Sequence, residues 1–411
     1  MSSHTAPGLT PSRAADPAAY ALGGVAPRRA LRPANRDEVA ESMHAAARDG
    51  LAVVPWGAGV SLVHEPPPPR YDLALDLTAL DRVVEYDPED FTLTAECGAT
   101  IAALRATLAA RGQELPLEAP HASRATLGGV LAADASGPRR LRFGAPHDRI
   151  LGARFVLADG TLVQSGGKVV KNVAGYGTHR LLCGSRGGLA VMVEASLKLA
   201  PAPEARVALC YRAGVAELAD AARWSRLPRL EPSLLSVVEA SLAAGLPAET
   251  DASFAVVLGL EDDGAWVSEQ EKAATAALGL PATRLAGDDA AALWQSLADL
   301  EETAGPRLSF TTAGNTPAAL APLLARRAAH RLVFHAPAGR LHLFPGREDA
   351  QAHLDAAAAH DFTLIGARGL AGIRGALPPQ TGLLALRARL RAALDPNGTL
   401  ALGGSWAAGT R

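Results

Sequence analysis

The chain has 411 residues, 48% of them hydrophobic, and a formal net charge of −2 at pH 7. This length can supply two or three domains with a substantial core, and the balanced charge lacks the basic footprint of a nucleic-acid-binding protein. The three cysteines form no Cys-x-x-Cys motif, which argues against a disulfide framework or an iron–sulfur cluster within this chain and is typical of a reducing cytoplasm. No uncharged apolar stretch approaches the ~20 residues of a membrane-spanning helix, so no transmembrane segment is expected.

The N-terminal part of the chain predicts a mixture of helices and strands. Its first 30 residues are rich in Ala, Pro and Arg and are expected to form a flexible arm. Asn35, with Glu38 three residues later, is a helix N-cap signal, and Asp49-Gly50 closes that helix. Thr100 caps a second helix, and strands are expected at 51–54, 73–77, 82–86 and 92–97. This order lacks regular βαβ alternation, so the predicted fold class is α+β.

Residues 53–69, VVPWGAGVSLVHEPPPP, contain a glycine loop after a short strand. A nicotinamide-binding Rossmann site would need a third glycine and a following helix. That glycine is missing here, and the four prolines lack the N–H groups that a helix needs. Apart from a plain tight turn, the remaining interpretation is a nest of backbone N–H groups, from Gly57 to Gly59, that holds an anion such as a phosphate.

Four segments resemble the FAD-binding domain of the vanillyl-alcohol oxidase and p-cresol methylhydroxylase (PCMH) superfamily. Residues 55–62 are similar to its pyrophosphate loop, Pro-x-Gly-Gly-Gly-Thr-Ser-Leu, and the segments ATLGGVLAADASG (125–137) and RFGAPHD (142–148) are similar to its next two blocks. The fourth block, residues 166–199, departs from the pattern at Gly177, Gly188, Ala190 and Val193. The resemblance implies a PCMH-type FAD-binding domain of two α+β subdomains. Because the loop has no His or Cys, FAD is expected to be bound non-covalently.

The same resemblance implies which residues contact FAD. By their positions in the four blocks they are Pro55, Trp56, Gly57, Ala58, Gly59, Val60, Ser61, Leu62, Thr126, Leu127, Gly128, Gly129, Ala132, Ser136, Gly137, Arg142, Gly144, Asp148, Lys171, Gly175, Tyr176, Gly187 and Val191.

Beyond residue 204 the pattern changes to strands that alternate with alanine-rich helices. Strands are expected at 206–211, 253–258, 331–335 and 340–343, and helices at 215–225, 264–277, 289–300 and 318–329. This predicts a second α+β domain with an antiparallel sheet, and the resemblance implies that it is a cap domain on the substrate side. The expected organisation is a flexible arm (1–30), the PCMH-type FAD-binding domain (31–204), the cap domain (205–380) and a C-terminal helix and tail (381–411).

The fourth block, with GGKVVKNVAGY followed by RLLCGS, resembles the FAD-binding E subunits of bacterial glycolate oxidases. The resemblance implies an FAD-dependent 2-hydroxyacid oxidoreductase that oxidises glycolate to glyoxylate, with a larger FAD-containing subunit and an iron–sulfur subunit as partners. Two alternatives stay open: a non-catalytic subunit that relays electrons or supports the complex, and a stand-alone 2-hydroxyacid dehydrogenase. A cytoplasmic location is expected, with attachment to the inner face of the plasma membrane through partners left open.

The catalytic residues are not identified by the sequence, and the candidates are weak. His335 and His342 resemble two metal-ligating histidines of related D-2-hydroxyacid dehydrogenases, but Leu370 stands where those proteins supply a glutamate. Since a zinc site wants at least three protein ligands, no bound metal is expected. His179 is a candidate proton acceptor, and Arg374 is a candidate for binding a substrate carboxylate or for filling the pocket.

Overall fold

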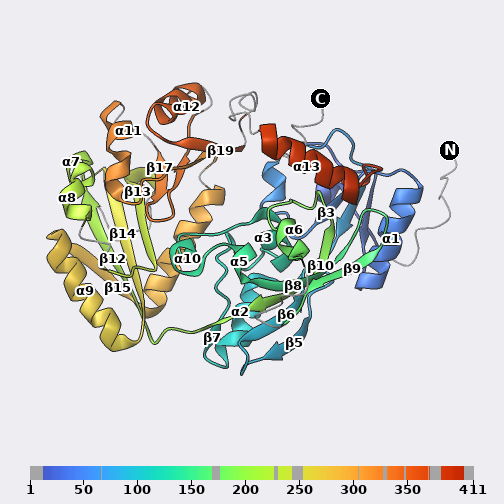
Figure 1. Cartoon of the computed structure of the whole chain (residues 1–411), viewed down its shortest axis with the longest axis horizontal. Coiled ribbons are helices and arrows are strands. Elements are labelled where there is room, and N and C mark those ends of the chain that lie inside the picture. Colours follow the sequence, from blue (N-terminus) through green and yellow to red (C-terminus); the bar gives the residue numbers. More distant parts are fainter. Residues whose placement is uncertain are drawn as a thin grey trace. The chain divides into compact units, whose positions relative to one another are not determined.

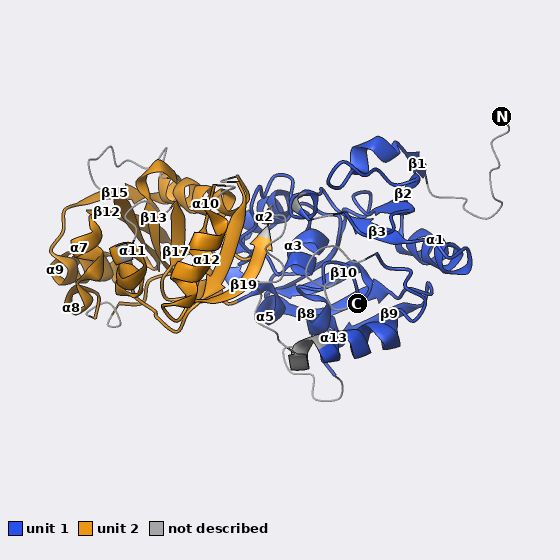
Figure 2. Ribbon diagram, turned by 90° about the horizontal axis from the view of Figure 1, so that it is seen from above, with its two compact units in different colours: residues 1–135, 145–202, 380–411 blue, residues 136–144, 203–379 orange. Residues whose placement is uncertain are grey.

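The computed structural model describes residues 13–65, 67–168, 176–225, 230–242, 253–303, 305–326, 331–346, 349–368, 370 and 381–401. The chain divides into two compact units, coloured separately in Figure 2. Unit 1 comprises residues 1–135, 145–202 and 380–411, and unit 2 comprises residues 136–144 and 203–379. The segment 136–144, which the sequence analysis assigned to the FAD-binding domain, therefore groups with unit 2, and the C-terminal helix groups with unit 1.

Unit 1 is built on a four-stranded and a five-stranded sheet, with a short two-stranded sheet beside them (Figure 1). The four-stranded sheet has the order β1-β2-β4-β3, in which β2, β4 and β3 are parallel and β1 is antiparallel to β2. The five-stranded sheet, β5-β6-β10-β8-β9, is antiparallel throughout. In chain order the elements are β1 (Arg13–Ala15), η1 (Pro17–Tyr20), β2 (Arg29–Arg32), α1 (Arg36–Arg48), β3 (Val53–Trp56), η2 (Leu62–His64), β4 (Leu73–Asp76), β5 (Val83–Asp87), β6 (Thr92–Glu96), α2 (Ile101–Ala109), β7 (Gln113–Glu114), α3 (Leu127–Ala133), α5 (Pro146–Arg149), β8 (Ile150–Val156), β9 (Leu162–Gly166), α6 (Thr178–Leu182), β10 (Val191–Lys198), β11 (Ala200–Pro201) and α13 (Thr381–Leu394).

Local signals in the sequence place two of these elements. The Asn35 side chain accepts hydrogen bonds from the backbone N–H groups of Asp37 and Glu38 at 3.1 and 3.0 Å, which fixes the start of α1 as predicted. The β8–β9 hairpin turns through Asp159-Gly160, where Gly160 has a φ of +91°. A positive φ is strained for residues with a side chain, so an Asp-Gly pair suits this turn.

The N-terminal segment differs from the expected flexible arm. Within residues 1–30, the described part from Arg13 onward is folded onto the first sheet, since β1 pairs with β2. Leu22 is completely buried, and the Tyr20 hydroxyl donates to the Asp76 carboxylate at 2.7 Å. The prediction of a flexible arm, made from the abundance of Ala and Pro, is wrong for these residues because a few apolar and aromatic side chains are enough to anchor the segment.

The C-terminal segment closes the same sheet on its other side. After α13, the buried Asp395 carboxylate accepts hydrogen bonds from the backbone N–H groups of Thr399 and Leu400, at 2.7 and 2.9 Å. This turn aligns Leu400 parallel to Val53 of β3, and the side chain of Leu400 is completely buried in the sheet's core. The last described residues are therefore part of the sheet that carries the glycine loop.

Unit 2 is a single eight-stranded antiparallel sheet covered by helices, as the sequence predicted for the cap domain (Figure 1). Its strand order is β15-β12-β14-β13-β17-β18-β16-β19. The elements are α4 (Arg140–Phe143), β12 (Ala205–Ala213), α7 (Val215–Ala219), α8 (Ala221–Trp224), β13 (Leu234–Glu239), η4 (Ala240–Leu242), β14 (Phe254–Asp262), α9 (Gly264–Leu278), β15 (Ala282–Ala286), α10 (Gly287–Thr303), β16 (Arg307–Thr311), η5 (Pro317–Leu320), α11 (Ala321–Arg326), β17 (Leu332–His335), β18 (Arg340–Leu343), α12 (Ala350–Ala358) and β19 (Thr363–Arg368).

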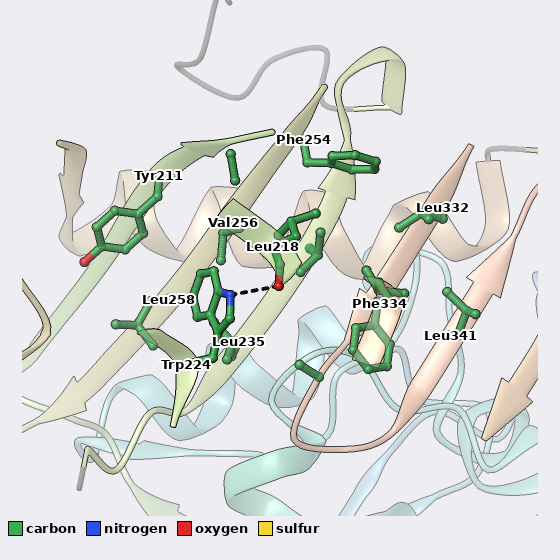
Figure 3. Close-up of a cluster of buried hydrophobic side chains, with 14 of the residues drawn as sticks. Tyr211, Leu218, Trp224, Leu235, Phe254, Val256, Leu258, Leu332, Phe334 and Leu341 are labelled. Atoms are coloured by element: carbon green, nitrogen blue, oxygen red, sulfur yellow. Dashed lines mark hydrogen bonds between the residues drawn. The ribbon is translucent and has the colours of Figure 1, made fainter. Parts of the chain in front are cut away.

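The sheet of unit 2 is buried on both faces. On one face, Val267 and Leu278 of α9 pack with strand residues such as Leu258, and Trp224 lies in this core with its indole Nε1 donating to the Leu218 carbonyl at 3.1 Å (Figure 3). On the other face, α10 packs Ala290, Leu293, Trp294 and Leu297 against alternate residues of the same strands. Such two-sided burial explains why these strands read as nearly continuous apolar runs.

Two predicted helices of unit 2 are interrupted. The helix expected at 215–225 is divided into α7 and α8 at Asp220, whose ψ of 83° is not helical and whose carboxylate caps α8 through the backbone N–H of Arg223. The helix expected at 318–329 begins as η5 and continues as α11 to Arg326, with 327–330 outside the described residues. Alanine-rich composition predicted helix correctly here but could not locate the breaks, which depend on single side chains.

Among the described helices, none combines the length and apolarity that crossing a bilayer requires.

Candidate functional site

The glycine loop of unit 1 follows β3 and is held close to two neighbouring groups. A Cβ on Gly57 would lie 2.1 Å from the Thr126 hydroxyl oxygen, and a Cβ on Gly59 would lie 2.7 Å from the Trp56 ring. Gly59 also has a φ of +73°. Trp56 itself is fixed from behind, because its indole donates to the Tyr71 hydroxyl at 2.6 Å. Only glycine allows the backbone to occupy this position, which confirms the loop's tight packing without yet naming its ligand.

The second wall comes from the segment that opens α3. Thr126 caps this helix, since its hydroxyl accepts from the Gly129 backbone N–H at 3.3 Å. Gly128 packs directly on the next subdomain, where an added Cβ would meet the Cβ of Cys97 at 2.9 Å and its carbonyl oxygen at 3.1 Å. The paired glycines therefore bring main chain from α3 against β6 and leave a smooth, backbone-rich surface toward the loop.

The third wall is the turn before β10. Gly184, Arg186 and Gly187 all have positive φ angles, of +77°, +53° and +75°. The turn is tied to α3 by hydrogen bonds from the N–H of Gly184 to the Leu131 carbonyl and from the N–H of Arg186 to the Ala132 carbonyl, at 3.0 and 2.8 Å. A Cβ on Gly187 would lie 3.2 Å from Pro55 Cγ, so this glycine lets the turn approach the end of β3.

These three walls line one pocket of unit 1, which is partly open to solvent. Small and apolar residues dominate its lining, and Arg186 is the charged residue among the described lining residues. A pocket lined by closely approaching backbone, small apolar side chains and a cationic side chain suits a ligand that combines an apolar part with phosphate. The lining residues are Pro55 to Leu62, Leu77, Cys97, Pro120, Ala125, Thr126, Gly128, Gly129, Val130, Ala132, Ala133, Ala135, Arg186, Gly187, Ala190, Val191 and Met192.

Many of the predicted FAD contacts line this pocket, namely 55–62, Thr126, Gly128, Gly129, Ala132, Gly187 and Val191. Others lie elsewhere. Leu127 is fully buried in the core, and the Asp148 carboxylate accepts from the backbone N–H of Ala145 at 2.9 Å. Tyr176 is 97% exposed. Ser136, Gly137, Arg142 and Gly144 group with unit 2, and Lys171 and Gly175 fall outside the described residues.

Ten described lining residues were missed by the sequence analysis, and two of them, Arg186 and Cys97, have ionisable side chains. Arg186 lies in the fourth block, between Ser185 and Gly187, and its guanidinium pairs with the Glu65 carboxylate just beyond the glycine loop. Cys97 lies behind Gly128, and burial raises the pKa of its thiol, so the sulfur is neutral at physiological pH. Arg186 stands at a position of the fourth block that the resemblance does not specify, and Cys97 lies outside the four blocks, so the structure was needed to place both residues at the pocket.

Comparison with known proteins identifies the ligand. Residues 27–166 match a protein family described as the FAD binding domain. The structure superposes on p-cresol methylhydroxylase with a TM-score of 0.70, covering 92% of this chain and 88% of that one, at 15% identity. Residues 27–166 therefore belong to an FAD-binding domain, FAD is the cofactor, and the chain has the fold of p-cresol methylhydroxylase. The predicted α+β fold, the resemblance and the cofactor are confirmed.

Within that class, the chain is similar to subunits of glycolate oxidases. It is 38% identical to the glycolate oxidase subunit GlcE of Escherichia coli (strain K12), over 38% of this chain and 45% of that protein. It is 29% identical to the subunit GlcD of Bacillus subtilis (strain 168), over 58% of this chain and 52% of that protein. A D-lactate dehydrogenase of Archaeoglobus fulgidus is 32% identical over 43% and 41%. These matches span about half the length of the curated relatives.

The weak catalytic candidates fall into three places. His179 does not line the pocket; its Nδ1 lies 3.1 Å from the Ser165 hydroxyl, and burial, helped by Arg180, lowers its pKa. Arg374 lies outside the described residues. His335 and His342 come together in unit 2, on the face of the sheet that α10 covers, and both approach Glu301 near the end of α10.

Glu301 was not anticipated from the sequence. Burial acts to raise its pKa, but the histidines and Arg307 that face the carboxylate outweigh burial and hold the pKa below its usual range. Burial lowers the pKa of His342, although the Glu301 carboxylate acts to raise it. The cluster thus presents an ionised carboxylate and imidazole nitrogen, which are donors that suit a divalent metal ion.

Proposed function

We propose that this chain is the FAD-binding subunit of an assembly that oxidises a 2-hydroxy acid, and that glycolate, converted to glyoxylate, is the substrate. The observation that carries the proposal is the FAD pocket of unit 1, in a chain that is 38% identical to the glycolate oxidase subunit GlcE of E. coli over 156 residues. The relatives named as glycolate oxidase subunits and as a D-lactate dehydrogenase support an FAD-dependent oxidoreductase acting on such acids.

The residues of unit 1 would each contribute to holding FAD. When bound, the flavin accepts a hydride from the C2 carbon of the acid. Gly57 and Gly59 let backbone N–H groups approach the pyrophosphate, and Arg186 partly offsets the phosphate charge. The alanine and valine side chains of the lining exclude water from the ring system. These roles concern binding and orientation, and they leave the proton acceptor for the substrate hydroxyl unassigned.

An anaerobic reduction experiment tests the proposal. The purified chain with FAD bound is mixed with glycolate while the flavin absorbance near 450 nm is recorded, with acetate as a control that lacks the 2-hydroxyl. Bleaching by glycolate and not by acetate is expected if this chain oxidises the acid at its own flavin. Bleaching by D-lactate but not by glycolate would show that the substrate is another 2-hydroxy acid and would exclude glycolate.

A second candidate function is that of an electron-carrying subunit whose partner performs the chemistry. It is favoured by one observation: the described lining residues of the pocket include no His, Asp or Glu that could accept a proton, and the thiol of Cys97 is held neutral. Under this function, glycolate bleaches the flavin only after the larger flavin-containing subunit is added. The stand-alone dehydrogenase makes the opposite prediction, namely bleaching and turnover with an artificial acceptor in the absence of any other subunit.

The proposed partners are a larger FAD-containing subunit and an iron–sulfur subunit. The match to proteins named as subunits supports such an assembly. Affinity purification of the tagged chain from its native host, followed by mass spectrometry and iron analysis, is expected to recover both partners. Recovery of the tagged chain alone at full specific activity would contradict the assembly.

A further inference from the structure

Polar side chains cross the sheet of unit 2 beneath α10, at positions where the neighbouring residues are apolar. Ser236 of β13 pairs in register with His335 of β17, and Ser309 of β16 pairs with His342 of β18. The strand order β13-β17-β18-β16 places these four residues on adjacent strands. His335 and His342 are only 3% and 6% exposed. Since burying polar groups is costly unless they are satisfied, a row of this kind calls for a specific explanation.

Both rings are oriented toward Glu301 by the serine hydroxyls. The Nδ1 atom of His335 lies 2.8 Å from Ser236 Oγ, and Nδ1 of His342 lies 3.0 Å from Ser309 Oγ. This leaves each Nε2 atom facing the carboxylate of Glu301, at 3.4 Å for His335 and 3.6 Å for His342. Hydrogen bonding of the far ring nitrogen is the arrangement that holds metal-ligating histidines in place.

The atoms that converge on this point are not satisfied by one another. Among the described residues, the Nε2 atom of His335 and the Oε1 atom of Glu301 are buried without a hydrogen-bond partner, although they lie only 3.4 Å apart. One ligand atom from each of the three residues lies within 4.8 Å of the other two. Ligands placed about 2.0–2.1 Å from a tetrahedral zinc ion would be separated by roughly 3.3 Å. The two distances between imidazole and carboxylate, 3.4 Å to Oε1 and 3.6 Å to Oε2, are close to this value.

Arg307 is consistent with a bound cation, although it carries a positive charge itself. Its guanidinium donates to the Glu301 backbone carbonyl at 2.6 Å and to Oε2 of the same residue at 3.2 Å. These contacts fix the side chain and occupy Oε2, while Oε1 is left facing His335. Metal-ligating carboxylates are commonly hydrogen-bonded in this way. The competing explanation is that Arg307 is simply the counter-ion of a metal-free cluster.

We propose that Glu301, His335 and His342 bind a divalent first-row transition metal ion, with Zn²⁺ as its simplest occupant. The carboxylate ligand comes from α10. It does not come from the position of Leu370, where related dehydrogenases supply a glutamate. Two imidazoles and one carboxylate leave one tetrahedral position for water. The inference rests on unit 2 alone and stands or falls independently of the proposed function.

Metal content of the purified chain is the primary test. After treatment with a chelator and dialysis, the full-length chain is expected to bind close to one Zn²⁺ per molecule, and Co²⁺ is expected to give the intense visible bands of a tetrahedral site. Thermal unfolding should shift to a higher temperature on adding Zn²⁺ at unchanged FAD content. Binding of less than a tenth of an equivalent of either ion would overturn the proposal. It would indicate that the cluster is metal-free and that Arg307 is its counter-ion.

Three variants locate the site within the chain. Glu301→Gln keeps the shape of the side chain and is expected to weaken Zn²⁺ binding at least 100-fold, while Ser236→Ala should weaken it about 10–100-fold, as for other residues that orient a ligand. Glu269→Gln, an exposed carboxylate on α9, is the matched control and should bind Zn²⁺ like the unaltered chain. Equal Zn²⁺ affinity in Glu301→Gln and the control would place any bound metal elsewhere and contradict the assignment, provided that circular dichroism shows both proteins folded.

Discussion

One of the two candidate sites of this chain is built mainly from main-chain atoms, and the other is built from side chains. The FAD pocket of unit 1 is bounded by main chain, with glycines where three segments approach one another. The cluster of unit 2 is made of side chains alone, brought together from α10, β17 and β18. A site made of backbone tolerates most changes around it but not an added Cβ, whereas a site made of side chains fails on loss of a single donor atom. Four predictions test how the two units and their sites respond to single substitutions.

The largest effect is expected in the core of unit 2. Trp224 is completely buried, and replacing it with alanine (Trp224→Ala) should lower the free energy of unfolding by about 3–5 kcal/mol. Because the described lining of the FAD pocket belongs to unit 1, FAD content should stay unchanged at temperatures below the new transition. Calorimetry together with flavin fluorescence measures both quantities. Release of FAD in parallel with the early transition would show that the two units do not behave separately.

A Cβ in the glycine loop tests the backbone site directly. Gly57→Ala should raise the dissociation constant of FAD at least 100-fold, because the new Cβ would overlap the Thr126 hydroxyl and push the loop into the pocket. Titration of the apoprotein with FAD gives the constant. Gly167→Ala is the matched control, since a Cβ there meets nothing within 4 Å. Unchanged FAD binding in Gly57→Ala would mean that the loop is not a wall of the cofactor site.

The closure of the first sheet by the C-terminal segment is tested by Asp395→Ala. The change leaves the N–H groups of Thr399 and Leu400 without their acceptor and should destabilise unit 1 by roughly 2 kcal/mol. Urea denaturation followed by flavin fluorescence is the measurement, and the exposed Asp81→Ala is the control. If the free energy of unfolding decreases no more than in the control, the contacts of Leu400 with Val53 form without the turn.

The smallest effect is expected for the one charged side chain among the described lining residues. Arg186→Ala should weaken FAD binding about 10-fold, a modest loss because the guanidinium is one-third exposed and partly screened. Glu65→Gln removes its ion pair but keeps the cation, so FAD binding should weaken less than in Arg186→Ala. The salt dependence of the FAD dissociation constant distinguishes a charge effect, which declines at high salt, from a packing effect, which does not.

The contrast between the sites also explains what the sequence could predict. The FAD loop follows β3 within a few residues, so its glycines form a contiguous pattern that local sequence carries. Glu301 lies on a helix far from His335 in the sequence, and no spacing links them. A signal did exist in the strands, because Ser236 and Ser309 interrupt apolar runs at positions that prove buried or half-buried. That signal indicates a buried polar cluster but does not identify Glu301 as the residue that the histidines approach.

Boundaries were less predictable than types of structure. The α+β class and the start of α1 followed from local rules, since each depends on neighbouring residues. The break at Asp220 and the assignment of 136–144 to unit 2 depend on tertiary context. In the second case, Arg139 forms a buried ion pair with Glu261, at 2.9 Å, and that partner lies more than a hundred residues away. No pattern within the block could have indicated such a contact.

The pairing of Leu400 with Val53 has a consequence for synthesis of the protein on the ribosome. β3 emerges early, but the segment that lies along its free edge is translated only after the whole of unit 2. Throughout that interval the nascent flavin-binding sheet carries an open edge beside its glycine loop, and exposed edges recruit other strands. We therefore expect the FAD site to reach its final form only after residues 395–401 have been translated, and nascent chains stalled before residue 395 to depend on chaperones.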